Sequence, residues 1–145
     1  MKRILIIFLI LFCSCIFIKS AQAWQLIDWE KFEKKTGWNQ EEVLLEGMIA
    51  GLHIADWIQT LKLSRNLGEY YERNPVIGKH PSKGRVNTCM GLFLAGKIIV
   101  PHYLPRDYNL WGWKIKPRKI FQYVTIGVSG YNVGRNYSIG LRFGF

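Results

Sequence analysis

Apolar residues at helical spacing, interrupted by a few polar ones, dominate the segment QEEVLLEGMIAGLHIADWIQTLKLSR at residues 40–65. Asn39, followed three residues later by Glu42, forms a capping-box pattern, which marks the start of a helix. We therefore predict one continuous helix over residues 40–65, roughly 38 Å long at about 1.5 Å per residue. A helix of that length is long enough to cross a bilayer.

A second apolar helix is predicted at residues 86–100, VNTCMGLFLAGKIIV. Ser82 is a suitable N-cap for it, and Pro101 is expected to end it because proline lacks a backbone N–H. Lys97 lies inside this segment, from where its long side chain is expected to reach towards the nearer helix end. Between the two helices, prolines and glycines predict a structured loop with a short helix at residues 69–72.

Two further segments lie outside this pair of helices. WEKFEKKTG places Trp29 and Phe32 on one face, and Gly37 suits the position after a helix end, so we predict a short interfacial helix there. In residues 118–145, glycines and β-branched residues fit either a third hydrophobic helix at 118–135 or a β-hairpin that turns at 134–136. The strict alternation of YSIGLRFGF at the C-terminus favours a strand. The expected fold is mainly α, a small helical membrane-associated bundle of two to three hydrophobic helices.

The first 23 residues have the three parts of a secretory signal peptide. Lys2 and Arg3 precede an apolar run at residues 4–18, and Ala21-Gln22-Ala23 supplies a small-x-small cleavage pattern. An uncleaved membrane anchor is the alternative, because the apolar run is long for a signal. Cleavage leaves about 120 residues, which we expect to form one small domain at residues 24–145. The protein is predicted to be exported to the bacterial inner membrane or the periplasmic membrane surface, rather than to the outer membrane.

The chain is strongly basic, with a formal net charge of +10, and most of the excess lies between Lys62 and Lys119. An exported basic protein meets anionic lipid headgroups rather than nucleic acid. Tryptophans interleaved with lysines strengthen this interpretation, because indole rings and ammonium groups share the headgroup zone of a membrane. We therefore expect membrane lipid as a partner and no nucleic acid.

Polar residues follow one edge of the predicted helix at residues 40–65. At 100° per residue a single sector collects Glu42, Glu46, His53, Asp56, Thr60 and Ser64. His53 and Asp56 are three residues apart and are expected to pair, which would raise the pKa of His53. The stripe is either a structural polar face or a site for a proton, an ion or a headgroup. His53 and Asp56, with Glu46 or His80 assisting, are the candidate catalytic residues.

Gly47, Gly51 and Ala55 lie four apart on a different face of the same helix. Such a small-xxx-small row allows another helix backbone to approach closely. We expect this face to pack against a helix of a protein partner or of a second copy of the chain.

The loop ERNPVIGKHPSKGR carries a second group of candidate residues. Prolines and glycines shape it, and its polar side chains are positioned to converge on a headgroup or another ligand: Glu72, Asn74, Lys79, His80, Lys83 and Arg85. A rigid turn between two helices is the alternative. The three histidines are too scattered for a metal site, and neither a metal nor a cofactor is expected.

DWIQTLKLSRN followed by YYERNPVIGKHPSKGRVN resembles a pattern found in small uncharacterised bacterial membrane proteins. The resemblance covers about half of the mature chain. It implies a helical membrane protein in which the segments at residues 40–65 and 86–100 pack together, and it implies no activity, cofactor or catalytic residue.

Together these features predict a small non-enzymatic accessory protein of the bacterial envelope, embedded in or bound to a membrane. Its small-residue helix face would dock a partner, and its basic loops would hold anionic headgroups. One alternative is a small membrane hydrolase or lipid-modifying enzyme that uses His53 and Asp56. Another is a soluble periplasmic binding domain whose polar stripe faces water.

Overall fold

The computed structural model of the chain describes residues 27–66, 71–72 and 74–141, and the predicted signal peptide lies outside this range. The protein is mainly helical, as the sequence predicts, with four helices and one short β-hairpin in the described residues. The chain divides into two units, residues 1–40 and 41–145, and each unit is described by itself.

The described part of the first unit is built around α2 (Trp29–Thr36). The carboxylate of Asp28 accepts a hydrogen bond from the backbone N–H of Lys31 and so caps the N-terminus of this helix. Gly37 follows the last turn with a φ of 70°, the left-handed conformation that glycine adopts at least cost. The rings of Trp29 and Phe32 meet edge to face, 5.5 Å between centroids, which confirms that they share one face.

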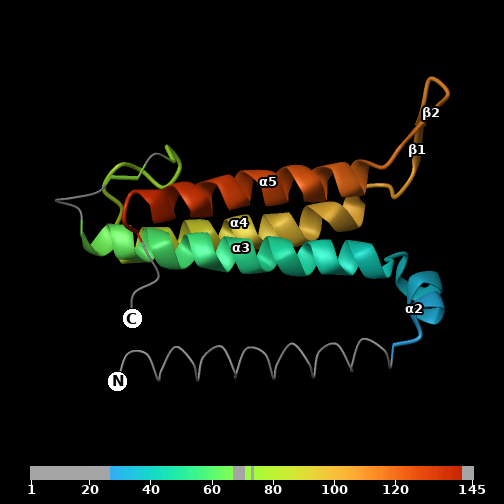
Figure 1. Cartoon of the computed structure of the whole chain (residues 1–145), viewed down its shortest axis with the longest axis horizontal. Helices are drawn as coiled ribbons and strands as arrows, with labels where there is room; N and C mark the ends of the chain where they lie inside the picture. The colour runs from blue at the N-terminus through green and yellow to red at the C-terminus, as the bar shows by residue number, and fades with distance from the viewer. Residues whose placement is uncertain (1–26, 67–70, 73, 142–145) are drawn as a thin grey trace. The chain divides into compact units, whose positions relative to one another are not determined.

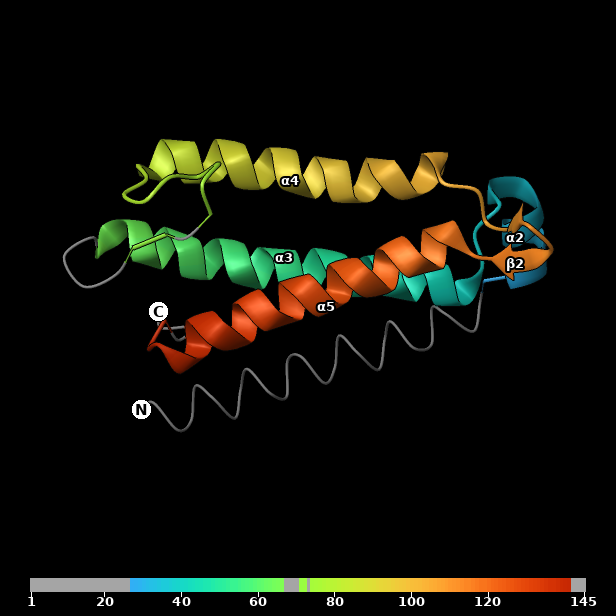
Figure 2. The ribbon, with the colours of Figure 1, turned by 90° about the horizontal axis from the view of Figure 1, so that it is seen from above.

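The second unit is a bundle of three long antiparallel helices (Figures 1 and 2). They are α3 (Gln40–Arg65), α4 (Lys83–Tyr103) and α5 (Pro117–Ser138). The C-termini of α3 and α5 and the N-terminus of α4 lie at the same end of the bundle, together with the loop that connects α3 to α4 (Figure 1). Helix α3 is continuous over the predicted range, which confirms the prediction for residues 40–65.

The helix α4 confirms the predicted N-cap, but it begins at Lys83, before the predicted start at residue 86, and it also ends later than predicted. Ser82 is its N-cap, and the Ser82 hydroxyl accepts a hydrogen bond from the backbone N–H of Arg85. The predicted stop at Pro101 is wrong, because the helix continues to Tyr103. A proline in the last turn removes only one intrahelical hydrogen bond, and its fixed φ is close to the helical value.

The C-terminal segment is helical from Pro117 to Ser138, so the predicted turn at residues 134–136 is wrong. The helical alternative for this segment is confirmed, although the helix is about one turn longer than predicted. Residues 137–138 belong to the helix and not to a strand, and residues 142–145 lie outside the described residues. Similarly, Tyr71 and Glu72 are not helical, while the rest of the short helix predicted at residues 69–72 is not described.

A small antiparallel hairpin connects α4 to α5, and the sequence analysis did not predict it. Its strands are β1 (Tyr108–Leu110) and β2 (Trp113–Ile115), and Leu110 pairs with Trp113 next to the turn. The two turn residues, Trp111 and Gly112, both have positive φ, 48° and 86°, as a two-residue hairpin turn of type I′ requires. The turn was missed because its first position carries tryptophan instead of the usual asparagine, aspartate or glycine.

The bundle places many polar side chains inside and many large apolar side chains outside. The buried polar and charged residues are Glu42, His53, Gln59, Thr60, Arg118, Gln122 and Ser129. Exposed apolar residues occur on all three helices, among them Met48, Ile58, Leu92, Ile99, Val124 and Val128. Among the residues that the structure describes, no helix has both the length and the apolar character needed to cross a membrane.

Candidate functional site

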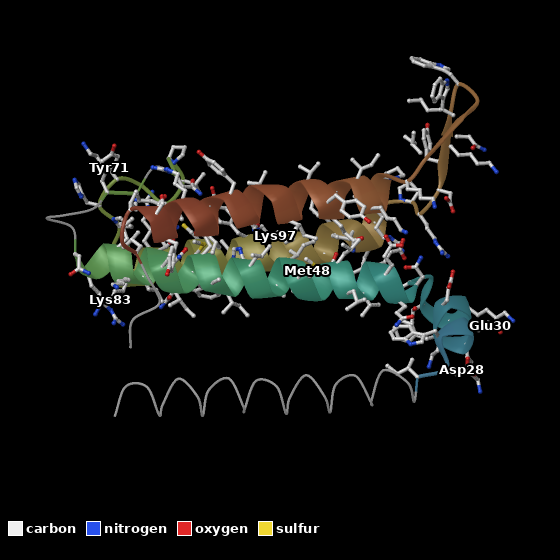
Figure 3. The ribbon with its side chains drawn as sticks, viewed as in Figure 1. Asp28, Glu30, Met48, Tyr71, Lys83 and Lys97 are labelled. Carbon is white, nitrogen blue, oxygen red and sulfur yellow. The ribbon has the colours of Figure 1, made fainter. Side chains whose placement is uncertain are left out.

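A polar cavity of about 360 Å³ lies between the three helices, on the side of the loop that joins α3 to α4. Each helix contributes three side chains at the spacing of one helical face. These are His53, Asp56 and Thr60 from α3, Met90, Phe93 and Lys97 from α4, and Asn132, Arg135 and Asn136 from α5. Glu72, Asn74 and Ile77 of the loop complete the lining. Lys97 lies near the middle of the bundle, whereas Tyr71 and Lys83 mark the loop end (Figure 3).

His53 is almost completely buried, and both of its ring nitrogens have partners within the protein. Its Nε2 lies 2.8 Å from the carbonyl oxygen of Met90, which only accepts, so Nε2 carries the proton. Its Nδ1 lies 3.0 Å from Nζ of Lys97 and therefore accepts a hydrogen bond. Desolvation lowers the pKa of His53, and the positive charge of Lys97 lowers it further, although the bond to Met90 acts in the opposite direction. His53 is thus held as a neutral imidazole.

The expected pair of His53 and Asp56 does not form. Asp56 instead accepts a hydrogen bond of 2.9 Å from the side-chain amide of Asn136. The expected rise in the pKa of His53 is also wrong, because burial outweighs any attraction from a carboxylate in this position. The two side chains lie on the same edge of α3, but they bond to different helices.

Asp56 is the acid with the clearest shift in this cavity. Burial raises its pKa to about 6, and the nearby negative charge of Glu72 adds to the rise. Attraction to Lys97 and the hydrogen bond from Asn136 oppose the shift and lower the pKa. The Asp56 carboxyl group therefore titrates near neutral pH, where a bound positive charge would favour its ionised form.

Lys97 donates to the hydroxyl oxygen of Ser129 at 3.0 Å as well as to His53. Desolvation lowers the pKa of Lys97, and attraction to Asp56 raises it. An ammonium group has three N–H donors, so Lys97 retains one donor for a ligand in the cavity it lines.

The loop residues Glu72 and Asn74 are fixed by local hydrogen bonds. The carboxylate of Glu72 accepts from the backbone N–H of Asn74 at 2.8 Å, and the side-chain oxygen of Asn74 accepts from the N–H of Val76 at 3.0 Å. The backbone N–H of Glu72 donates to the carbonyl oxygen of Lys79 at 3.0 Å. These bonds give the loop one shape and hold both residues at the cavity.

Arg135 and Asn132 also line the cavity, but their side chains make no hydrogen bond or ion pair within the described residues. Both side chains are half-buried. A guanidinium and an amide that face a cavity without a protein partner are available to a ligand. The sequence did not single out either residue or Asn136, because a helix and a hairpin both remained open for the segment that contains them.

The opposite end of the bundle holds a second polar network, which is closed. The buried carboxylate of Glu42 lies 3.5 Å from Arg118, whose guanidinium also donates to the carbonyl oxygens of Pro101 at 3.1 Å and Leu104 at 3.3 Å. Arg118 thereby caps the C-terminus of α4. This network ties the three helices together, and its residues do not line the polar cavity described above.

Glu46 belongs to this closed network and not to the cavity, unlike the candidate catalytic residues His53 and Asp56. Its Oε1 accepts a hydrogen bond of 3.0 Å from the side-chain amide of Gln122. Its Oε2 and the Oε1 of Gln122 are buried without a partner in the described residues. Burial raises the pKa of Glu46, although the same amide and the charges of His102 and Arg118 oppose the rise. A protonated Glu46 has an O–H group to donate, which would satisfy both oxygens.

The predicted headgroup loop is only partly gathered at the cavity. Glu72 and Asn74 line it. Arg85 donates to the carbonyl oxygen of Val76 at 3.0 Å, and the ammonium of Lys79 lies 5.5 Å from the centre of the Tyr71 ring. His80 and Lys83 are exposed and do not line the cavity.

The small-residue row of α3 is not used for packing within the described part of this chain. Gly47 and Gly51 are exposed, and Ala55 is half-buried. A methyl group added at Gly47 or at Gly51 would meet no atom within 4 Å. This face of α3 is therefore open.

No group of three or more histidine, cysteine, aspartate or glutamate side chains among the described residues is arranged to hold a metal ion. Comparison of the chain with protein-family models, with curated proteins and with solved structures gave no match in any of the three.

Proposed function

We propose that this protein is a small membrane-bound accessory protein of the bacterial envelope that acts by binding and not by catalysis. The observation that carries the proposal is the distribution of side chains in the bundle, with ionisable and amide groups inside and large apolar groups outside. Groups that are costly to place in lipid face the interior of helical membrane proteins, where they pair with one another or line a cavity. An outer surface that is largely apolar is unusual for a monomeric protein in water.

Each helix contributes to the outer apolar surface. The exposed apolar side chains are Leu44, Met48, Ile54 and Ile58 on α3, Leu92, Ile98 and Ile99 on α4, and Ile120, Val124 and Val128 on α5. We propose that lipid covers these faces. The same three helices supply the polar interior. Each helix therefore has an apolar outward face and a polar inward face, as a bundle surrounded by lipid requires.

The two ends of the bundle favour the same environment. At the hairpin end, Trp111 and Trp113 are 93% and 77% exposed and stand beside Lys114 and Lys116 in the sequence. At the other end, Lys83 and Arg85 begin α4. Tryptophan and lysine at the ends of an apolar bundle match the composition of membrane–water interfaces. Basic ends would also attract anionic headgroups.

The geometry favours binding over catalysis by His53. A general base must reach the proton that it removes, and both nitrogens of His53 are already occupied by Met90 and Lys97. Ser129, which Lys97 contacts, is buried and does not line the cavity, so it is poorly placed as a nucleophile. A lipid-modifying hydrolase is the second candidate, because Asp56 lines the cavity and its pKa of about 6 suits a general base.

Carbonate extraction and vesicle flotation of the full-length chain test the proposal. Four lysines at outward positions of α3 and α5, in place of Ile54, Ile58, Val124 and Val128, should move the protein from the membrane to the soluble fraction. A matched control exchanges isoleucine and valine at the same four positions and should remain with the membrane. An unchanged membrane fraction for the four-lysine variant would refute lipid contact at these faces.

A further inference from the structure

The cavity contains two acids and two bases that come from different elements. Asp56 on α3 and Glu72 in the following loop supply the carboxylates, whereas Lys97 on α4 and Arg135 on α5 supply the cations. The negative charge of Glu72 acts on Asp56, which places the two carboxylates near each other. Charges of both signs therefore border the cavity, since α4 and α5 bring the basic groups to it.

Three of these charges, those of Asp56, Lys97 and Arg135, are not neutralised by ion pairs with each other. No ion pair joins Asp56 to Lys97 or Arg135 among the described residues, although Asp56 and Lys97 attract each other across the cavity. Arg135 has no side-chain partner in the described structure, and Lys97 retains a donor. Uncompensated charges at a cavity require a ligand or water to replace their hydration.

The balance of charges restricts the ligand. A simple anion would meet the two carboxylates, and a simple cation would meet Lys97 and Arg135. An apolar ligand would leave the amide of Asn132, the guanidinium of Arg135 and the hydroxyl of Thr60 without partners, which is costly at a buried site. A ligand that carries both signs of charge a few ångströms apart satisfies all of these groups.

We propose that this cavity binds a small zwitterion, with its ammonium group beside Asp56 and Glu72 and its phosphate or carboxylate group beside Lys97 and Arg135. Arg135 offers parallel N–H donors that suit either anion, and the amide of Asn132 adds another donor. A bound ammonium stabilises the ionised form of Asp56, and the ligand takes up the one free N–H of Lys97.

The volume of about 360 Å³ suits a compact polar group and not a whole lipid molecule. Phosphoethanolamine has the required chemistry, since it joins a primary ammonium to a phosphate through two carbons. The same group occurs free in solution and as the head of a zwitterionic phospholipid. The zwitterion proposal deepens the proposed binding function, and the lipid source in particular depends on the membrane location.

Calorimetric titration of the purified full-length chain in a neutral detergent tests the inference. The probes are phosphoethanolamine, ethanolamine alone and glycerol phosphate, followed by nanodiscs of phosphatidylethanolamine and of phosphatidylglycerol. We expect phosphoethanolamine to bind at least tenfold more tightly than either one-charge probe. Asp56→Asn and Arg135→Gln should each weaken this binding at least tenfold, since each removes one partner of a charged group.

Asp107→Asn and Lys114→Gln are matched controls, because they remove the same charges from exposed positions next to and within the hairpin. Both controls should bind like the unaltered chain, and thermal unfolding should show that all four variants are folded. An Asp56→Asn or Arg135→Gln variant that is folded and binds with unchanged affinity would overturn the proposal.

The titrations with nanodiscs distinguish the two sources of the ligand, free in solution or in a phospholipid. Binding of both free phosphoethanolamine and phosphatidylethanolamine supports recognition of the group itself, and binding of the phospholipid alone supports a membrane-derived ligand. The inference is overturned if phosphatidylglycerol binds as tightly as phosphatidylethanolamine, or if no probe binds. Carbonate extraction fails or succeeds independently of these titrations, because it reports on the outer faces of the helices and not on the cavity.

Discussion

The two ends of the three-helix bundle use similar polar residues in opposite ways. At the hairpin end, Glu42 and Arg118 are buried together, and Arg118 also donates to the carbonyl oxygens of Pro101 and Leu104 at the end of α4. At the loop end, Asp56 and Arg135 face a cavity, and Arg135 has no side-chain partner among the described residues. The buried carboxylate of Glu42 has ion-pair partners, whereas Arg135 has none among the described residues, so we expect the first group to support the fold and the second to serve binding.

The largest effect is expected at the closed end. Arg118→Ala leaves the fully buried Glu42 carboxylate without its 3.5 Å partner and uncovers the carbonyl oxygens at the end of α4. Breaking a buried pair in this way costs about 3 to 5 kcal/mol of unfolding free energy. Chemical denaturation in neutral detergent measures the change. Lys34→Ala is the control, because Lys34 belongs to an exposed ion pair and its loss should change the unfolding free energy little. A loss below about 1 kcal/mol for Arg118→Ala would show that the closed network does not support the fold.

Removal of a charge at the open end should change the stability of the protein in the opposite direction. Because folding raises the pKa of Asp56 from 3.8 to about 6, the folded state binds more protons in this interval, and its stability falls as pH rises from about 4 to about 6. Asp56→Asn removes this loss and should stabilise the ligand-free protein by up to about 3 kcal/mol at pH 7 to 8. Thermal unfolding across pH 4 to 8 measures both quantities. A destabilised variant, or an unchanged pH slope, would mean that Asp56 belongs to the fold in the same way as Glu42.

A smaller gain is expected on the open face of α3. Gly51→Leu places a side chain where no atom lies within 4 Å, so helix propensity alone decides the effect on the isolated chain. Leucine exceeds glycine by about 0.8 kcal/mol in a helix, and denaturation should show a gain of up to this size. Docking of a partner helix on Gly47, Gly51 and Ala55 stays a prediction. Co-purification in mild detergent with the Gly51→Leu variant tests it, because docking requires that the added side chain break the complex.

The smallest change is expected at Glu46. Its pKa is raised by burial, so its proton is bound more tightly in the folded state, and the stability of the protein declines as pH rises above the ordinary value of 4.5. Glu46→Gln replaces the proposed O–H donor with an amide donor and should leave stability at pH 5 almost unchanged. Comparison of denaturation midpoints at pH 5 and pH 8 checks this, because the variant should show a smaller difference between the two than the unaltered chain. A large loss at pH 5 would indicate that Glu46 is ionised in the folded state.

Local patterns along the chain were sufficient to predict the helices. The apolar spacing of residues 40–65 and the N-cap Ser82 predicted helix starts that the structure confirms. The left-handed Gly37 was predicted by the same kind of signal. Pro101 was misjudged because the cost of a proline depends on how many helical residues follow it, and here only two do.

The candidate site was predictable only as far as it depends on one helix. His53 and Asp56 were recognised because they lie on one edge of α3, and the cavity indeed contains both. Their partners Met90, Lys97 and Asn136 come from helices that are distant in the sequence, so no spacing rule could assign them. Asn132, Arg135 and Asn136 have helical spacing, but neighbouring glycines made a turn equally plausible at the level of sequence.

Photolabelling with a carbene probe dissolved in lipid tests the central claim most directly, because it reports which side chains touch lipid without any substitution in the sequence. The proposed arrangement predicts labels on the outward residues Ile54, Ile58, Val124 and Val128 and none on the inward residues His53, Lys97 and Ser129. Mass spectrometry of the digested protein locates the labels. If the outward residues were unlabelled in vesicles, while a water-soluble probe labelled them fully, these faces would not contact lipid and the account would be contradicted.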